Sequence, residues 1–399
     1  MRLHLTPVLL GFIFAGLLAA PSQAQSSYYD TIAENIVNQS LAVQPGEVII
    51  INGGPTEVDL MAAIEVAVAK AGGESIVQLS IPEANKRMIM ETPMEHLRRL
   101  PTAGLLMNRI ADGFISVGSV QDPDLFADVP EERLSVARKS GLPLADAFAT
   151  ATVRTVALGQ TGGIPTEAYA KTQGADYEEM ASVFWESVGV SSETLAHDAK
   201  AIASYLKPGT AMKLTTTAGT DLSFKVADVA ARINAGRTAD VVQPSGSASV
   251  WLPAGEAYAA VDLHSASGTL VIPHLTFRGE AVHNLRVTFA GGTIASMTAD
   301  SGVEKVKAYL DASDAPSKRL SVVDVGVNKE SRPLEGSNYV SWEMAGMVTL
   351  MVGNNTWTGG DNNAESALPF HVAGATLTAD GKVLVQNGEL QGVSLSMNE

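Results

Sequence analysis

Polar residues that could do chemistry are concentrated in one stretch of this sequence, residues 322–373. Apolar runs with the composition of buried strands alternate there with glycine, asparagine, histidine and acidic residues, in the segments VVDVGVN, EMAGMVTLMVGNN, WTGGDNN and LPFHVAG. A polar group without a partner in an apolar setting costs about 1–3 kcal/mol or more. Polar side chains set among such strands therefore indicate that this stretch binds something.

Several other catalytic arrangements are missing from the sequence. It contains 0 cysteines, so it has no thiol nucleophile, and it has neither a G-x-S-x-G nor an H-E-x-x-H motif. Gly53 and Gly54 follow an apolar run, but the full G-x-G-x-x-G spacing is absent, which favours a tight turn over a nucleotide site. We interpret the Met and Trp residues within 344–357 as core packing.

The elements before residue 205 alternate between two kinds of pattern. Short apolar runs at 47–52, 75–80 and 113–117 have the pattern of buried strands, and the segments 28–41, 59–71, 130–139, 177–188 and 192–206 have helical patterns. Strand, glycine turn, helix and strand form a βαβ unit, which is typical of a parallel sheet. We therefore predict an open, mainly parallel α/β domain over residues 26–205.

The elements after residue 206 are mostly short alternating segments between glycines. They lie at 211–217, 221–226, 257–261, 269–272, 286–289 and 293–297, and one helix at 303–310 precedes the apolar run at 322–327. This pattern predicts a strand-rich α+β domain over residues 206–399, which carries the candidate site. We interpret His264, His274 and His283 as surface or turn residues.

The N-terminus has the pattern of a secretory signal peptide. Arg2 precedes an uncharged apolar run at residues 5–20, and Pro21 and the triplet Ser22-Gln23-Ala24 follow it. We predict cleavage after Ala24 and a periplasmic or secreted protein, with an uncleaved membrane anchor as the alternative. No later stretch is apolar enough to cross a bilayer, so we expect no membrane association after cleavage.

The charge of the chain excludes one class of partner. The formal net charge is −16, and removal of residues 1–24 takes away only Arg2, which leaves −17. A chain this acidic repels phosphate backbones, so we expect no nucleic-acid partner. The lack of cysteine agrees with export, where stray thiols are exposed to oxidation.

Five segments in order resemble the M29 family of metallo-aminopeptidases, the aminopeptidase T group. They are PGEVIII near the start, GTDLSF at 219–224, PAGEAY at 253–258, SGTLVI at 267–272 and the block from Val322 onward. The resemblance extends over most of the mature chain. It implies a hydrolase that removes N-terminal residues from peptides, uses two divalent ions held by carboxylates and histidines with a tyrosine nearby, and forms a homodimer.

Carried over residue by residue, the resemblance gives a partial metal site. Glu256 in PAGE stands at a metal-ligand glutamate, Asp324 replaces a glutamate with a side chain one methylene shorter, and His371 is the retained histidine of a His-x-Asp pair. Glu343 is a further candidate ligand. Tyr339, in the loop before it, is the candidate electrophilic residue, and Glu256 is also a catalytic candidate.

Two departures from the family pattern reduce the expected number of metal ions. Thr349 stands where the family has a histidine between two glycines, and Ala373 replaces the aspartate that follows His371. Two carboxylates and one imidazole suit a single zinc, cobalt or manganese ion. The sequence therefore predicts one ion or none.

Two functions remain open. One is an exported M29-like aminopeptidase with an altered metal site. The other is a catalytically silent relative that serves as a binding or assembly module in the cell envelope, with His371 as an ordinary buried histidine.

Overall fold

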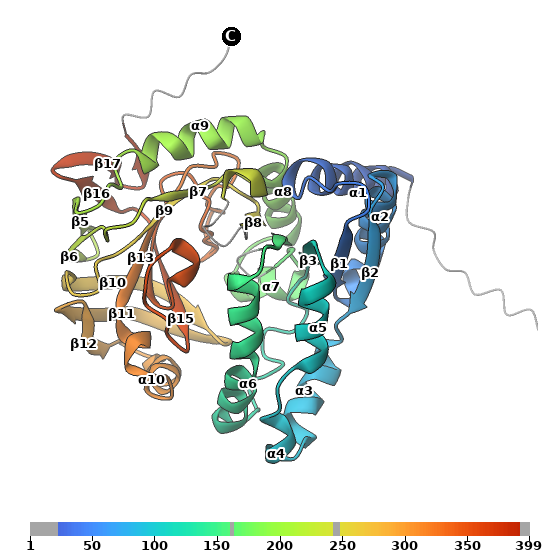
Figure 1. Cartoon of the computed structure of the whole chain (residues 1–399). Coiled ribbons are helices and arrows are strands. Elements are labelled where there is room, and N and C mark those ends of the chain that lie inside the picture. The colour runs from blue at the N-terminus through green and yellow to red at the C-terminus, as the bar shows by residue number, and fades with distance from the viewer. Residues whose placement is uncertain (1–22, 160–162, 242–247, 392–399) are drawn as a thin grey trace, which may run out of the picture.

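The structure is a computed structural model that describes residues 23–159, 163–241 and 248–391. The described residues form one parallel sheet, two antiparallel sheets and the helices that pack against them (Figure 1). The predicted signal peptide lies almost entirely outside these residues, since only Gln23 and Ala24 of it are described. No helix within the described ranges is long and apolar enough to span a bilayer. The predicted fold class, an α/β part followed by a strand-rich part, is confirmed.

The parallel sheet has the strand order β2-β1-β3-β4-β8, and every neighbouring pair in it is parallel. Its strands are β1 (Val48–Gly53), β2 (Glu74–Leu79), β3 (Gly113–Val117), β4 (Arg154–Leu158) and β8 (Ala248–Leu252). Helices cover both faces of this sheet. On the interior strand β1, Ile49 and Ile51 pack with α2, and Ile50 packs on the opposite side, with α5 and α6.

Nine helices of the described residues precede the first antiparallel strand. They are α1 (Gln23–Asn35), α2 (Val58–Lys70), α3 (Pro82–Glu91), α4 (Met94–Leu97), α5 (Thr102–Ile110), α6 (Glu131–Thr150), α7 (Glu167–Gln173), α8 (Tyr177–Val188) and α9 (Ser192–Ala203). A π-helical turn, η1 (Ile36–Ser40), continues α1, and the 3-10 turn η2 (Pro55–Glu57) leads into α2.

The two antiparallel sheets have eight and five strands. The larger has the order β12-β11-β10-β6-β5-β16-β17-β18, and the smaller has the order β15-β14-β13-β9-β7. The strands of the larger sheet are β5 (Ala211–Thr215), β6 (Asp221–Lys225), β10 (Ser267–Phe277), β11 (Glu280–Ala290), β12 (Thr293–Thr298), β16 (Thr376–Ala379), β17 (Lys382–Gln386) and β18 (Glu389–Leu390). Helix α10 (Val303–Asp311) packs against β11 and β12.

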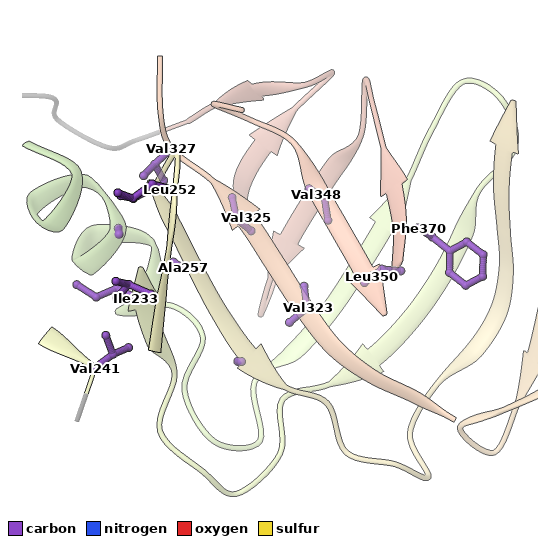
Figure 2. Packing of buried hydrophobic residues seen from close by; sticks show 14 of the residues in the cluster. Ile233, Val241, Leu252, Ala257, Val323, Val325, Val327, Val348, Leu350 and Phe370 are labelled. Carbon is purple, nitrogen blue, oxygen red and sulfur yellow. The ribbon is translucent and has the colours of Figure 1, made fainter. Parts of the chain in front are cut away.

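The smaller antiparallel sheet carries the candidate site. It consists of β7 (Arg232–Asn234), β9 (Glu256–Ala260), β13 (Leu320–Gly326), β14 (Val348–Gly353) and β15 (Ala367–Val372). One face of this sheet is apolar and belongs to the main core; Val323, Val325, Leu350 and Phe370 lie on it (Figure 2). Because side chains alternate along a strand, the polar residues between them point to the opposite face.

One strand crosses the predicted boundary near residue 205. β8 lies well after that boundary in sequence, yet it pairs with β4 and completes the parallel sheet. A short turn at residues 253–255 then leads directly into β9 of the antiparallel sheet. The two sheets are thus joined at the PAGE segment, next to Glu256.

The prediction that His264, His274 and His283 are surface or turn residues is confirmed, since all three are exposed.

Candidate active site

Five side chains from five neighbouring strands form a row across the polar face of the smaller antiparallel sheet. Strand pairing places them in the order Arg232, Tyr258, Asp324, Thr349 and His371, each directly opposite the next. Opposed residues of an antiparallel pair point to the same face, with Cβ atoms about 4.5–5.5 Å apart. The row therefore places a guanidinium, a phenol, a carboxylate, a hydroxyl and an imidazole next to one another on the same face of the sheet.

Asp324 lies at the centre of this row and is completely buried. Neither of its carboxylate oxygens has a hydrogen-bond partner among the described residues. Burial, and then the charges of Glu256 and Glu343, raise the pKa of Asp324 well above its usual range. A buried ionised carboxylate is more costly than a neutral unpartnered group. Asp324 therefore needs either a proton or a positively charged neighbour.

Glu256 lies two residues before Tyr258 on β9, so both side chains face the same side of the sheet. Its Oε2 atom accepts a hydrogen bond from Asn234 Nδ2, at 3.0 Å, and another from the indole Nε1 of Trp251. Asn234 also donates to the carbonyl oxygen of Trp251 at 2.9 Å. Since Trp251 belongs to β8, Glu256 is held at the junction of the two sheets.

Glu343 approaches the row from the loop between β13 and β14. A Cβ on Gly326 would lie 2.2 Å from the carbonyl oxygen of Met344, so only glycine lets this loop cross the end of β13. The carboxylate accepts hydrogen bonds from Ser331, at 2.8 Å, and from Ser341. Burial raises the pKa of Glu343, and the hydrogen bonds from both serines oppose that shift. Glu343 is thus a buried acid with its own donors.

Thr349 and His371 interact directly at the end of the row. Thr349 Oγ1 lies 2.8 Å from His371 Nδ1, and the direction of this hydrogen bond depends on the tautomer. The His371 ring meets the Trp342 ring edge to face, with centroids 5.4 Å apart. Burial lowers the pKa of His371 to about 4, so the ring is neutral at neutral pH. Thr349 therefore orients the imidazole and leaves Nε2 unengaged by this bond.

Tyr339 and Asn328 lie away from the row. Tyr339 packs in a separate apolar cluster, and burial, followed by the charge of Glu343, raises its pKa. Asn328 donates to the carbonyl oxygens of Ser187, at 3.0 Å, and Ala254, at 2.7 Å, and so ties together three segments of backbone. Tyr339 is thus near Glu343, while its electrophilic role remains a prediction.

Sequence reasoning missed an aromatic wall beside the row. The rings of Trp251, Tyr258 and Trp357 contact one another, with centroids 5.7, 5.5 and 5.0 Å apart. With Arg232, Val241 and Ser249 they line a cavity of about 100 Å³. Tyr258 could have been found, because a residue two positions after Glu256 on a strand shares its face. Arg232 carried no such signal.

The oxygen ligands around Asp324 are of a type that binds divalent cations. Its two unpartnered oxygens offer ligands, and two further acids act on it electrostatically. In their present orientations, the described residues contain no group of three or more His, Cys, Asp or Glu side chains that could hold a metal ion. Glu343 is engaged by its serines and His371 by Thr349. The ligand set of Glu256, Asp324, Glu343 and His371 therefore remains a prediction, with Asp324 as its best-placed member.

Comparison with protein families matches residues 26–343 to Peptidase_M29, thermophilic metalloprotease (M29), which covers well over half of the chain. The chain belongs to the M29 family. The predicted family resemblance is thereby confirmed. The match ends at Glu343, so Thr349 and His371 lie beyond it. None of the curated protein sequences matches the chain.

Two solved structures share the fold over nearly the whole chain. Wild-type AmpT from Thermus thermophilus has a TM-score of 0.71 at 16% identity, and the alignment covers 92% of this chain and 99% of that one. A 2,5-dihydroxypyridine dioxygenase from Pseudomonas putida has a TM-score of 0.60 at 13% identity, with 93% and 99% covered. At these identities the likeness establishes the fold, and family membership supports a metallopeptidase.

Proposed function

We propose that this protein is an exported M29-type hydrolase that removes N-terminal residues from peptides at the site around Asp324, with at most one divalent cation. The observation that carries the proposal is the completely buried carboxylate of Asp324, whose two oxygens have no hydrogen-bond partner among the described residues. In a family of metalloproteases, an acid kept in this costly state supports a functional role over a structural one.

Asp324 and Glu256 are the residues that would hold the cation, with Glu343 and His371 as further candidates. A bound divalent cation polarises the carbonyl of the scissile peptide and makes a water molecule more acidic. The chain's own groups set the surroundings: Asn234 and Trp251 fix the Glu256 carboxylate, and Thr349 fixes the His371 ring. If the Nδ1 proton of His371 is donated to Thr349, the unprotonated Nε2 atom is left to accept a proton or a cation.

The second candidate function is that of a catalytically silent relative, and two observations favour it. Thr349 stands in the position of a family histidine, and the described residues offer no ready group of three metal ligands. The fold also occurs in a dioxygenase, so the fold by itself does not fix the chemistry. Peptide turnover therefore has to be measured.

The test combines metal binding with hydrolysis. Purified mature protein would be stripped with a chelator, given zinc, cobalt or manganese, and assayed for melting temperature and for release of N-terminal residues from short peptides. We expect a rise in melting temperature by mass action and metal-dependent hydrolysis. An Asp324→Asn variant and a Glu256→Ala, His371→Ala double variant should lose both responses.

A matched control separates this site from general ion binding to an acidic surface. Glu57 is also buried, at 6% exposed, but lies in the parallel sheet region, so Glu57→Gln should keep both responses. Equal stabilisation of all variants by metal would overturn the proposed site. Metal binding without hydrolysis of any peptide would favour the silent relative. Export is tested separately, since we expect the mature protein to begin at Gln25.

A further inference from the structure

The cavity beside the row is lined by hydrogen-bond donors and aromatic rings. Arg232, Tyr258 and Ser249 bring a guanidinium, a phenol and a hydroxyl to it, while Trp251 and Trp357 bring indole rings. Its volume of about 100 Å³ corresponds to about three water molecules at their liquid volume of about 30 Å³ each. The space therefore fits a small polar group such as a carboxylate with one or two carbon atoms behind it.

Arg232 is partly buried and has no acidic partner among the described residues. Its one hydrogen bond there goes from Nη1 to the carbonyl oxygen of Trp357, at 2.7 Å. Val241 also lines the cavity. Residues 242–247, which come after it in the sequence, lie outside the described ranges, and their sequence, VQPSGS, contains no acid. The planar guanidinium fork matches the two oxygens of a carboxylate. Arg232 thus has donors available for an acidic ligand.

Tyr258 supplies a second donor between Arg232 and Asp324. It is 2% exposed and lines the cavity, and a phenol hydroxyl can donate one hydrogen bond. Ser249 supplies a third donor, because its oxygen accepts from Thr155 at 2.7 Å and its own proton remains to be donated. A cavity that offers three donors favours an acceptor with several lone pairs.

We propose that this cavity binds a carboxylate of the substrate, held by Arg232 and Tyr258 on the side of Asp324 opposite to His371. Strands lie about 4.8 Å apart, so Arg232 is two strand spacings, about 10 Å, from Asp324 in the row. This spacing suits either the C-terminal carboxylate of a short peptide or an acidic side chain near the bond that is cut. Arg232 is then a residue that determines substrate specificity. This role rests on the proposed function, whereas the binding of a carboxylate in the cavity does not depend on it.

Intrinsic fluorescence gives a binding assay that does not require turnover. The chain has 4 tryptophans, and Trp251 and Trp357 line the cavity. Propionate would be titrated into the mature protein against propionamide, its neutral counterpart of similar shape, at constant ionic strength. We expect a saturable change in emission with propionate and at least tenfold weaker binding of propionamide, since hydrogen bonds to a charged group are the stronger kind.

Three variants test which groups hold the carboxylate. Arg232→Gln should weaken propionate binding at least tenfold, and Tyr258→Phe, which keeps the ring packing, should weaken it about threefold to fivefold. Arg99→Gln removes an exposed arginine elsewhere on the surface and should leave binding unchanged. Near-ultraviolet circular dichroism would check that each variant keeps its aromatic packing. Equal responses to propionate and propionamide, or unchanged propionate binding in Arg232→Gln, would overturn the proposal.

Peptide assays then distinguish the two sources of the carboxylate. If the C-terminus is bound, Ala-Ala should be hydrolysed with a KM about tenfold lower than Ala-Ala-amide, and Arg232→Gln should abolish that difference. If an acidic side chain is bound, Asp-Ala-amide should replace Ala-Ala as the preferred substrate in the same comparison. Hydrolysis with neither preference would refute the specificity role. Absence of all hydrolysis would instead refute the proposed function, while the fluorescence result would still decide whether the cavity binds carboxylates.

Discussion

Glu57 and Asp324 are both buried carboxylates, but their surroundings differ in one decisive way. Glu57 accepts hydrogen bonds from the backbone N–H of Gly54, at 3.0 Å, from Thr56 Oγ1, at 2.6 Å, and from the hydroxyl of Ser119. Neither oxygen of Asp324 has a partner among the described residues. The hydrogen bonds that Glu57 accepts within the protein compensate for its burial, whereas Asp324 has no such compensation from the described residues.

The location of each acid makes the difference more informative. Glu57 lies just beyond the ends of β1 and β3, where the order of the parallel strands reverses, which is the place where open α/β sheets commonly bind ligands. Asp324 lies in the interior of an antiparallel sheet, which topology alone would not single out. A buried acid therefore indicates a candidate site by its missing hydrogen bonds more than by its position in the fold.

The largest expected effect is on hydrolysis. Asp324→Asn keeps the shape of the side chain but removes its charge and its titratable proton, so we expect peptide hydrolysis to fall about 10²-fold or more. Glu57→Gln should stay within about twofold of the native rate, because Glu57 lies at the parallel sheet. Initial rates on one short peptide at saturating metal would measure both. A similar loss in both variants would mean that activity follows general stability, and the comparison would fail.

The next effect is an opposite change in stability. In chelator-treated protein, Asp324→Asn should raise the free energy of unfolding by about 1–3 kcal/mol, since it removes the cost of burying a carboxyl group that must either take up a proton or stay ionised without a partner among the described residues. Glu57→Gln should lower it by about 1–2 kcal/mol, since an amide cannot accept all three hydrogen bonds of the carboxylate. Urea denaturation would give both values. If Asp324→Asn is as destabilising as Glu57→Gln, then Asp324 has an unrecognised structural partner.

The pH dependence of stability isolates Asp324 from its neighbours. Its pKa is raised in the folded state, so above the unfolded value of about 3.9 the folded protein binds more protons, and this group makes stability fall as pH rises. The lowered pKa of His371, about 4 against an unfolded 6.5, makes stability rise with pH between those values. Asp324→Asn should therefore give a more positive slope over pH 4–6.5 than the native protein, measured by urea denaturation without metal. Parallel pH profiles would contradict the raised pKa of Asp324.

Much of the fold could be predicted from local patterns. The buried run at β3 and the amphipathic helix α8 lie where the sequence predicts them, because each carries its own periodicity. The strands β10 and β11 are longer than predicted, since both continue through exposed residues such as His274 and His283, which pair with each other without an apolar pattern. The strands β4 and β8, which pair with each other, were not predicted.

The candidate site was predictable only where one residue carries the signal. Glu256 and Asp324 stand out as acids within apolar runs, and both are buried in the site. The bond between Thr349 and His371 and the position of Arg232 beside Tyr258 depend on the pairing of separate strands. Those pairings join segments that are distant in sequence, and a local sequence pattern does not indicate which strands pair.

The smallest expected effect concerns a single donor to the satisfied acid. Ser119→Ala removes one of the three hydrogen bonds to Glu57 while Gly54 and Thr56 remain, so we expect a loss of about 1 kcal/mol in the free energy of unfolding. Ser116 lies on β3, three residues before Ser119, and makes no hydrogen bond to Glu57. The free energy of unfolding of Ser116→Ala should therefore stay within about 0.5 kcal/mol of the native value. Neither change should affect hydrolysis. If Ser119→Ala leaves the free energy of unfolding unchanged, the two remaining donors are enough for Glu57. If it lowers the rate of hydrolysis, the region at the ends of β1 and β3 takes part in function. The contrast between Glu57 and Asp324 would then no longer distinguish a structural acid from a functional one.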